Sequence, residues 1–259
     1  MKKMFDLFDP KSMAVVGASA AEHKWGHYVA KHSLLGQERR RCYLINKSGG
    51  EILGQQAYKT LGDLPEVPEL ITLTVPPAAA ETAVAEALQL GAKTFVMMTG
   101  GFGEQGPEGK AREKRLVEQI KSHGAVLFGP NCVGIHDADT DLYAGRILYP
   151  NGPIGVVSQS GLITHDLSRY CRDINSGFSR CINLGNQADF DVRDGLDAFV
   201  GHKPTKALIV YCEDMLNGRE FMSAASRVVN SGIPLILITV GASEAAASSA
   251  KSHTGALVS

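Results

Sequence analysis

The sequence predicts an α/β protein with two successive domains, each built on a parallel sheet. Short runs rich in β-branched and aromatic residues alternate with longer segments whose apolar residues have helical spacing. This alternation breaks down once, between residues 136 and 152, and then begins again. Such a pattern is typical of βαβ units, in which helices connect parallel strands.

The first domain is expected to span residues 1–136. Five short apolar runs predict its strands, and the Ala- and Glu-rich segment 79–90 between the third and fourth runs predicts a helix. The predicted strands cover residues 13–16, 42–45, 70–75, 94–98 and 125–128.

Residues 136–152 are expected to connect the domains, because they hold several aspartates, Pro150 and Gly152 and have no regular period. The second domain is then expected over residues 153–259. After its last strand the small-residue stretch 242–255 predicts either a mobile tail or a fragment of a longer protein, and we favour the fragment. The predicted strands are 154–157, 178–184, 207–211 and 235–240, with helices at 162–174, 192–200 and 220–229.

Composition narrows the class of protein. Of 259 residues, 44% are apolar and 20% charged, as in ordinary globular proteins, and the net charge of −1 favours neither nucleic acid nor an anionic membrane. We expect no signal peptide and no membrane span, since no apolar run is long enough for either. The five cysteines are scattered without CxxC pairs, which predicts reduced thiols, no metal site and a cytoplasmic protein.

The first predicted strand is followed directly by Gly17, Ala18 and Ser19. A turn of this kind lets a phosphate approach backbone amides, but the spacing is not GxGxxG, and a plain tight turn is the alternative. Cations at 39–41 and Lys47 flank the second strand, where an NAD site has a carboxylate. These cations could bind a ribose phosphate, as found in NADP or CoA, or could simply form a solvated basic surface. Lys47 is a better candidate for phosphate binding than the arginines.

Three further loops follow strands of the first domain at the edge where open α/β sheets bind ligands. They supply the candidates Val75 and Pro76, Gly101 and Phe102, and Asn131 and Cys132. Loop glycines and prolines also serve ordinary turns, so each loop alone is compatible with a purely structural role.

In the second domain, Ser158, Ser160 and Gly161 join a strand to a helix. Hydroxyls and free amides at the positive end of a helix would hold an anion, although a serine there can simply cap the helix. His253 lies in a small, polar stretch and is a candidate phosphoryl carrier, with Glu213 as the carboxylate that orients it. An ordinary surface histidine is the alternative.

Seven segments occur together and in order along almost the whole chain: FDPKS (8–12), VVGAS (15–19), GFGE (101–104), GPNCVG (129–134), SQSG (158–161), LGNQAD (184–189) and SHTGA (252–256). With these the chain resembles the CoA-binding and ligase domains of NDP-forming acyl-CoA synthetases, relatives of the succinyl-CoA synthetase alpha subunit. The resemblance implies a Rossmann-like CoA-binding domain followed by a flavodoxin-like parallel α/β domain.

The resemblance also implies roles. His253 would become phosphorylated, Glu213 would steady it, and the helix start at Ser160 and Gly161 would hold phosphate. CoA would lie along Gly17, Ser19, Lys47, Val75 and Pro76, with its thiol near Asn131 and Cys132. A small carboxylic acid would react through an acyl phosphate. ATP or ADP with Mg²⁺ would act only through an ATP-grasp domain or beta subunit, of which no segment is present, and an oligomer is compatible with the family.

Two positions depart from the family. Thr239 stands where a lysine is usual, and Ala242 where an arginine is usual. The loss of both cations bears on turnover more than on CoA binding, so a non-catalytic or regulatory CoA-binding module is the alternative function. An NADP-dependent dehydrogenase would explain the first domain but neither Ser158–Gly161 nor His253. The sequence does not specify the acid, or ADP against GDP.

Overall fold

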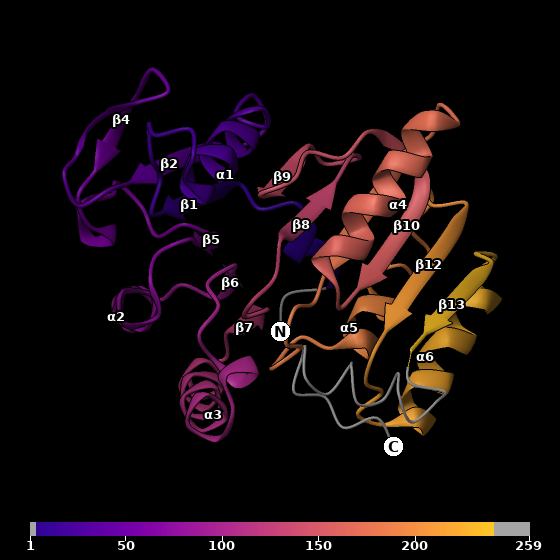
Figure 1. The fold of residues 1–259 in the computed structure, drawn as a ribbon. Helices are drawn as coiled ribbons and strands as arrows, with labels where there is room; N and C mark the ends of the chain where they lie inside the picture. Colours follow the sequence, from indigo (N-terminus) through magenta and orange to yellow (C-terminus); the bar gives the residue numbers. More distant parts are fainter. Residues whose placement is uncertain (1–3, 241–259) are drawn as a thin grey trace.

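The computed structural model describes residues 4–240, which form two sheets side by side (Figure 1). The first sheet has the order β3-β4-β2-β1-β5-β6-β7, and every neighbouring pair is parallel except β3 and β4. Its strands are β1 (Ser12–Val16), β2 (Arg41–Ile45), β3 (Gly50–Ile52), β4 (Gln55–Tyr58), β5 (Leu70–Leu73), β6 (Thr94–Met97) and β7 (Val126–Phe128).

The helices of this half begin and end where local chemistry dictates. The 3₁₀ turns are η1 (Met4–Phe8), η2 (Leu61–Asp63) and η3 (Gly103–Gln105), and the α-helices are α1 (Trp25–Leu34), α2 (Pro77–Leu90) and α3 (Pro107–Ser122). Both α2 and α3 start with proline, which lacks the N–H that a first turn leaves unpaired. Gly91 ends α2 in the left-handed conformation.

The second sheet has the order β13-β12-β10-β11-β8-β9, parallel from β13 to β11, with β8 and β9 antiparallel at one edge. Its strands are β8 (Gly134–Asp137), β9 (Leu142–Gly145), β10 (Asn151–Ser158), β11 (Phe178–Asn183), β12 (Ala207–Cys212) and β13 (Leu235–Thr239), with helices α4 (Gly161–Asp173), α5 (Val192–Asp197) and α6 (Gly218–Asn230). The α/β architecture with two parallel-dominated sheets is therefore as predicted.

The segment 136–152, expected to be irregular, is instead part of the second sheet. It contributes β9, the last two residues of β8 and the first two residues of β10. The aspartates suggested a loop, but Asp137 is buried in the sheet with partners: it binds Arg180 through Oδ2 and accepts the amide N–H of Asp139 through Oδ1. The change of sheet falls between β7 and β8.

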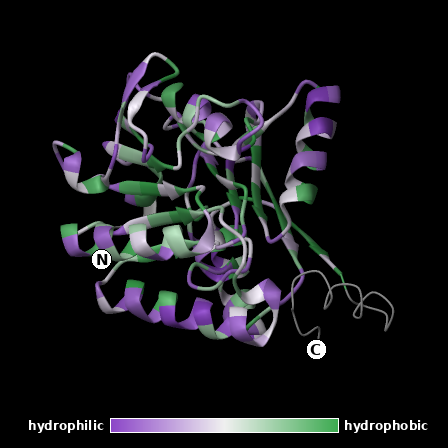
Figure 2. Cartoon of the chain, turned by 60° about the vertical axis from the view of Figure 1, so that its left-hand side comes forward, coloured by the Kyte–Doolittle hydropathy of each residue, from purple (hydrophilic) through white to green (hydrophobic). Residues whose placement is uncertain are grey.

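Contacts between the two halves are extensive. One apolar core runs through both sheets and includes Val15, Phe128, Ile182 and Val210. The buried Arg40 side chain donates hydrogen bonds to three carbonyls, those of residues 10, 140 and 141, and so ties β2 to the turn between β8 and β9. Figure 2 shows apolar residues concentrated in the strands and hydrophilic residues along the helices. Within residues 4–240, no helix combines the length and apolarity needed to cross a membrane.

Candidate functional site

The turn after β1 is shaped by close packing. Gly17 has φ +95°, and a Cβ there would lie 2.7 Å from Thr74 Oγ1. The amides of Gly17 and Ala18 both donate to the carbonyl of Ile45, at 3.0 and 3.1 Å, so they are already paired. Ser19 is buried, and its hydroxyl accepts the N–H of Ala21. The turn thus keeps the sequence-predicted position, but its first two amides bind the sheet.

The cations beside β2 divide into two groups. The arginines have structural partners: Arg39 pairs with Asp9, Arg40 is buried against carbonyls, and Arg41 pairs with Glu66. Lys47 is exposed just past the strand end, and its amine makes no hydrogen bond or ion pair with the described residues. Of the four cations, Lys47 is therefore the one without a partner among residues 4–240.

The loops after β5 and β6 lie together. The carbonyl of Val75 accepts a hydrogen bond from the hydroxyl of Thr99 at 2.7 Å, and Pro76 is exposed at the start of α2. A Cβ at Gly101 would lie 2.6 Å from Pro77 Cγ, so the two loops touch. Phe102 is fully buried in the core, which gives its side chain a packing role.

Asn131 and Cys132 follow β7 and differ in exposure. Asn131 is exposed, has φ +58° and donates through its side chain to Asn186 at 3.2 Å. Cys132 is 2% exposed and contacts the carbonyl of Met97. Burial raises the pKa of its thiol to about 12, so this cysteine is a neutral core residue.

The start of α4 combines a helix cap with a helix N-terminus. The Ser160 hydroxyl accepts the N–H of Ile163, and the Ser158 hydroxyl binds both the amide and the carbonyl of Ser160. A Cβ at Gly161 would lie 2.6 Å from the Val133 side chain, so α4 begins directly against the loop that leads from the first sheet. The first amides of a helix have no partner within the helix and can hold an anion.

Glu213 follows β12 at the same edge of the second sheet and is 8% exposed. Its Oε2 has no hydrogen-bond partner among the described residues. Burial, and then the neighbouring Glu213 carboxylate, raise the pKa of Tyr211 to about 12. His253 and Ala242 lie outside the described residues, whereas Thr239 is the exposed last residue of β13.

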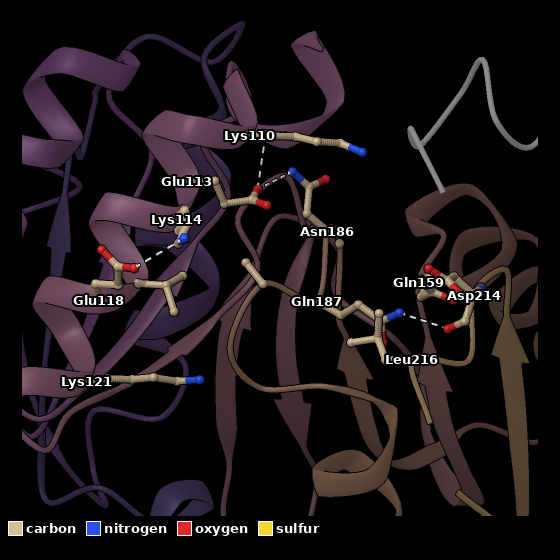
Figure 3. A pocket seen from close by; sticks show the side chains of 14 residues that line it. Lys110, Glu113, Lys114, Glu118, Lys121, Gln159, Asn186, Gln187, Asp214 and Leu216 are labelled. Atoms are coloured by element: carbon tan, nitrogen blue, oxygen red, sulfur yellow. Dashed lines mark hydrogen bonds and ion pairs between the residues drawn. The ribbon is translucent and has the colours of Figure 1, made fainter. Parts of the chain in front are cut away.

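Between these loops and α3 lies a cavity of about 440 Å³ (Figure 3). One wall is α3, with Lys110 and Glu113, and the opposite wall carries Gln159, Gln187 and Asp214. The predicted site residues Asn131, Ser160 and Glu213 do not line this cavity but adjoin residues that do: Asn131 donates to Asn186, Ser160 follows Gln159, and Glu213 precedes Asp214.

Asn186 closes one end of this cavity. Its amide donates to Glu104 at 2.7 Å and to Glu113 at 2.8 Å. Burial opposes ionisation of Glu104, but hydrogen bonds from Asn186 and from backbone amides outweigh it and lower its pKa. At Glu113 burial dominates and raises the pKa. One amide thus holds two carboxyl groups of different acidity.

Sequence reasoning did not single out Gln159, Asn186 or Gln187 as site residues. The signal was present, since all three lie in the motifs SQSG and LGNQAD, but an uncharged amide in a loop has no distinctive spacing. Within residues 4–240, no group of three or more His, Cys, Asp or Glu side chains is arranged to hold a metal ion.

Comparisons with known proteins identify the family of each half of the chain. Residues 11–138 match the family model of a CoA binding domain, and residues 151–259 match that of a succinyl-CoA ligase like flavodoxin domain. The alpha subunit of ADP-forming acetate–CoA ligase II from Pyrococcus furiosus is 35% identical over 97% of this chain and 55% of its own length. The ADP-forming 4-hydroxybutyrate–CoA ligase of Nitrosopumilus maritimus is 29% identical over 97% of this chain and 37% of its own length.

Among solved structures, the dinucleotide forming acetyl-coenzyme A synthetase 1 of Ca. Korarchaeum cryptofilum, in complex with phosphate and ADP, superposes with a TM-score of 0.91. It is 31% identical, over 100% of this chain and 56% of that one. The fold and site thus define a CoA-binding domain joined to a ligase-type flavodoxin domain. The chain belongs to the NDP-forming acyl-CoA synthetase family, and it spans about half the length of the curated relatives that it matches first.

Proposed function

We propose that this chain is the CoA-binding component of an NDP-forming acid–CoA ligase, with His253 as the phosphoryl carrier and Glu213 as its orienting carboxylate. The observation that carries the proposal is Glu213 itself. Its carboxylate is buried, has one unpartnered oxygen and follows β12, the neighbour of the strand β10 that leads into α4. The loop that holds Asn131 reaches the start of α4 through Val133, which packs against Gly161. Imidazole N–H is a donor that would satisfy that oxygen.

The residues present fit CoA along the carboxyl edge of the first sheet. Lys47 would bind the ribose phosphate, because it is the cation near β2 left without a partner in the described part of the chain. The close-packed turn at Gly17 and the loops at Val75 and Gly101 would line the path to the thiol end near Asn131. CoA itself would supply the thiol that displaces phosphate from an acyl phosphate.

The chain's own groups would then act on charge and position. The α4 N-terminus, from Ser160 onward, would stabilise the phosphate, and Glu213 would stabilise the positive charge on the imidazole. The carboxylic acid would enter beside these groups, and the cavity of about 440 Å³ is large compared with acetate. Phosphorylation of His253 from a nucleotide, with Mg²⁺, would require an ATP-grasp domain or beta subunit.

Calorimetric titration with CoA, with NADPH as the comparator, tests the first half of the proposal. We expect CoA to bind and NADPH not to bind. The variant Lys47→Ala should weaken CoA binding about 10- to 100-fold, since a hydrogen bond to a charged group contributes about 1.5–3 kcal/mol. Lys31→Ala, an exposed lysine on α1, is the matched control and should bind as the unaltered chain does. Binding of NADPH alone would contradict the proposal.

Phosphohistidine formation tests the second half. Incubation with acetyl phosphate should label His253, and His253→Ala should remove the label. CoA binding without any labelling would identify a non-catalytic CoA-binding module instead.

A further inference from the structure

The backbone at Glu213 and Asp214 is held by a glutamine from the neighbouring strand end. Gln159 Oε1 accepts the N–H of Glu213 at 2.5 Å and that of Asp214 at 3.0 Å. The Gln159 N–H donates to the carbonyl of Tyr211 at 3.1 Å. Gln159 thus continues the hydrogen-bond ladder between β10 and β12 past the last paired residues, with its side chain in place of the next carbonyl.

A second glutamine holds the same turn from the opposite side. Gln187 Nε2 donates to the carbonyl of Asp214 at 2.9 Å (Figure 3). Gln187 has φ +44°, a backbone conformation that residues other than glycine adopt at a cost in free energy. A Cβ on the preceding Gly185 would lie 2.2 Å from the carbonyl oxygen of Pro130, so the loop fits only without one. The backbone of this loop is therefore constrained, and from it the Gln187 side chain reaches the carbonyl of Asp214.

At this turn two buried side-chain oxygens have no hydrogen-bond partner among the described residues, Oε2 of Glu213 and Oε1 of Gln187. Each such oxygen costs about 1–3 kcal/mol of stability if nothing binds it. Strain and unpaired polar groups that persist at one place mark a functional site more often than a structural one. The backbone of Glu213 is thus fixed while one of its carboxylate oxygens stays available.

We propose that Gln159 and Gln187 are positioning residues that fix Glu213 for phosphoryl transfer to and from His253. This inference rests on the proposed function of Glu213. Without the Gln159 carbonyl both amides lose their acceptor, and the turn and its carboxylate shift. A shift of about 1 Å in a group that orients a reactant costs up to about a hundredfold in rate.

The test is phosphoryl uptake from acetyl phosphate by the full chain. In this step an imidazole nitrogen of His253 bonds to phosphorus, the bond from phosphorus to the acetate oxygen breaks, and acetate leaves while the imidazole proton passes to solvent. Gln159→Met removes the acceptor at similar length, whereas Gln159→Glu retains it. Gln187→Met removes the second contact, and Gln119→Met, at an exposed position of α3, is the matched control.

We expect Gln159→Met to lower the maximal rate of uptake about 10- to 100-fold with an unchanged half-saturating concentration of acetyl phosphate. Gln159→Glu should recover most of that rate, Gln187→Met should show a smaller loss, and Gln119→Met none. The rate of amide hydrogen exchange over residues 211–216 should rise in Gln159→Met but not in Gln159→Glu. The affinity for CoA should be unchanged in both variants.

Three results would overturn the proposal. An unaltered rate in Gln159→Met would show that Glu213 needs no such support, while leaving the proposed function intact. Equal losses in Gln159→Met and Gln159→Glu, accompanied by weaker CoA binding, would indicate a general structural role. If the unaltered chain takes up no phosphoryl group, the proposed function itself fails and this inference fails with it.

Discussion

Replacing Arg180 by methionine should destabilise the pairing of β8 with β11 in the second sheet in a pH-dependent manner. Arg180 Nε lies 2.5 Å from Asp137 Oδ2, and the two side chains are 3% and 0% exposed. The guanidinium carbon also lies 4.1 Å from the centre of the Phe8 ring. The substitution therefore leaves a buried carboxylate without its cation and removes a contact with the N-terminal segment.

The expected cost follows from these contacts. Removing one partner of a buried ion pair typically costs 3–5 kcal/mol. Asp137 keeps two amide hydrogen bonds to Oδ1, from Asp139 and Thr140, which places its share near the lower limit, about 3 kcal/mol. The lost contact with Phe8 adds about 1 kcal/mol. We expect the free energy of unfolding, measured with urea at pH 8, to fall by about 4 kcal/mol.

His202 makes this cost depend on pH. Its Nε2 lies 3.8 Å from Asp137 Oδ2, and burial, followed by the charge of Arg180, lowers its pKa to about 4. Without Arg180, the His202 pKa rises, and protonated His202 can pair with Asp137. A higher folded-state pKa of His202 favours the folded state at low pH, where the unfolded histidine, with a pKa of about 6.5, is also protonated. This contribution to stability is lost as the pH increases. The deficit of Arg180→Met should therefore be smaller at pH 5 than at pH 8.

The control is the double variant Arg180→Met/His202→Phe compared with the single variant His202→Phe, because both lack the His202 titration. The stability difference between these two variants should be the same at pH 5 and at pH 8. A loss below about 1 kcal/mol in Arg180→Met at pH 8 would refute the assigned role of the ion pair. If the loss of stability in Arg180→Met is equal at both pH values, protonated His202 does not replace Arg180 as the partner of Asp137.

Two further predictions concern stability. Gly185→Ala should lower the free energy of unfolding by more than about 2 kcal/mol, because its Cβ would meet the Pro130 carbonyl. Gly201→Ala is the control and should lower it by only about 1 kcal/mol, because Gly201 has φ +74° but a Cβ there would have no atom within 4 Å. Equal losses in the two variants would contradict the packing argument. His136 is 1% exposed, and burial lowers its pKa to about 4, below its unfolded value, so between pH 6.5 and pH 4 it should remove up to about 3 kcal/mol of stability as pH falls. His136→Phe should flatten that part of a urea-unfolding profile, and an unchanged slope would show that His136 does not cause it.

The strands that the sequence predicted well are the buried parallel ones. The run predicted at 13–16 is β1 at Ser12–Val16, and that predicted at 207–211 is β12 at Ala207–Cys212. Strands covered on both faces are almost continuously apolar and therefore easy to recognise. The hairpin β3–β4 was missed, because its strands are short, polar and largely exposed.

In the candidate site, the loops could be predicted from the sequence but the partners of single side chains could not. Loops at strand ends were predictable because parallel strands end at one edge. The partners of Arg39–Arg41 were not, since Asp9, Glu66 and the carbonyls of 140 and 141 lie far away in sequence. Gln159 and Gln187 act through hydrogen bonds to a backbone 54 and 27 residues away, and no local pattern predicts such contacts.

The membership of β8 in the second sheet determines how this protein can be divided for separate expression. A chain cut after residue 136 would carry three residues of β8 without β11, their pairing partner, and would lack the carboxylate of Asp137. The complementary piece from residue 153 would expose the edge of β11 and lack Asp137, which pairs with Arg180. An unpaired strand edge is a template for aggregation. A cut between Phe128 and Gly134 would keep each sheet whole, and the exposed part of the shared apolar core would then be the remaining obstacle.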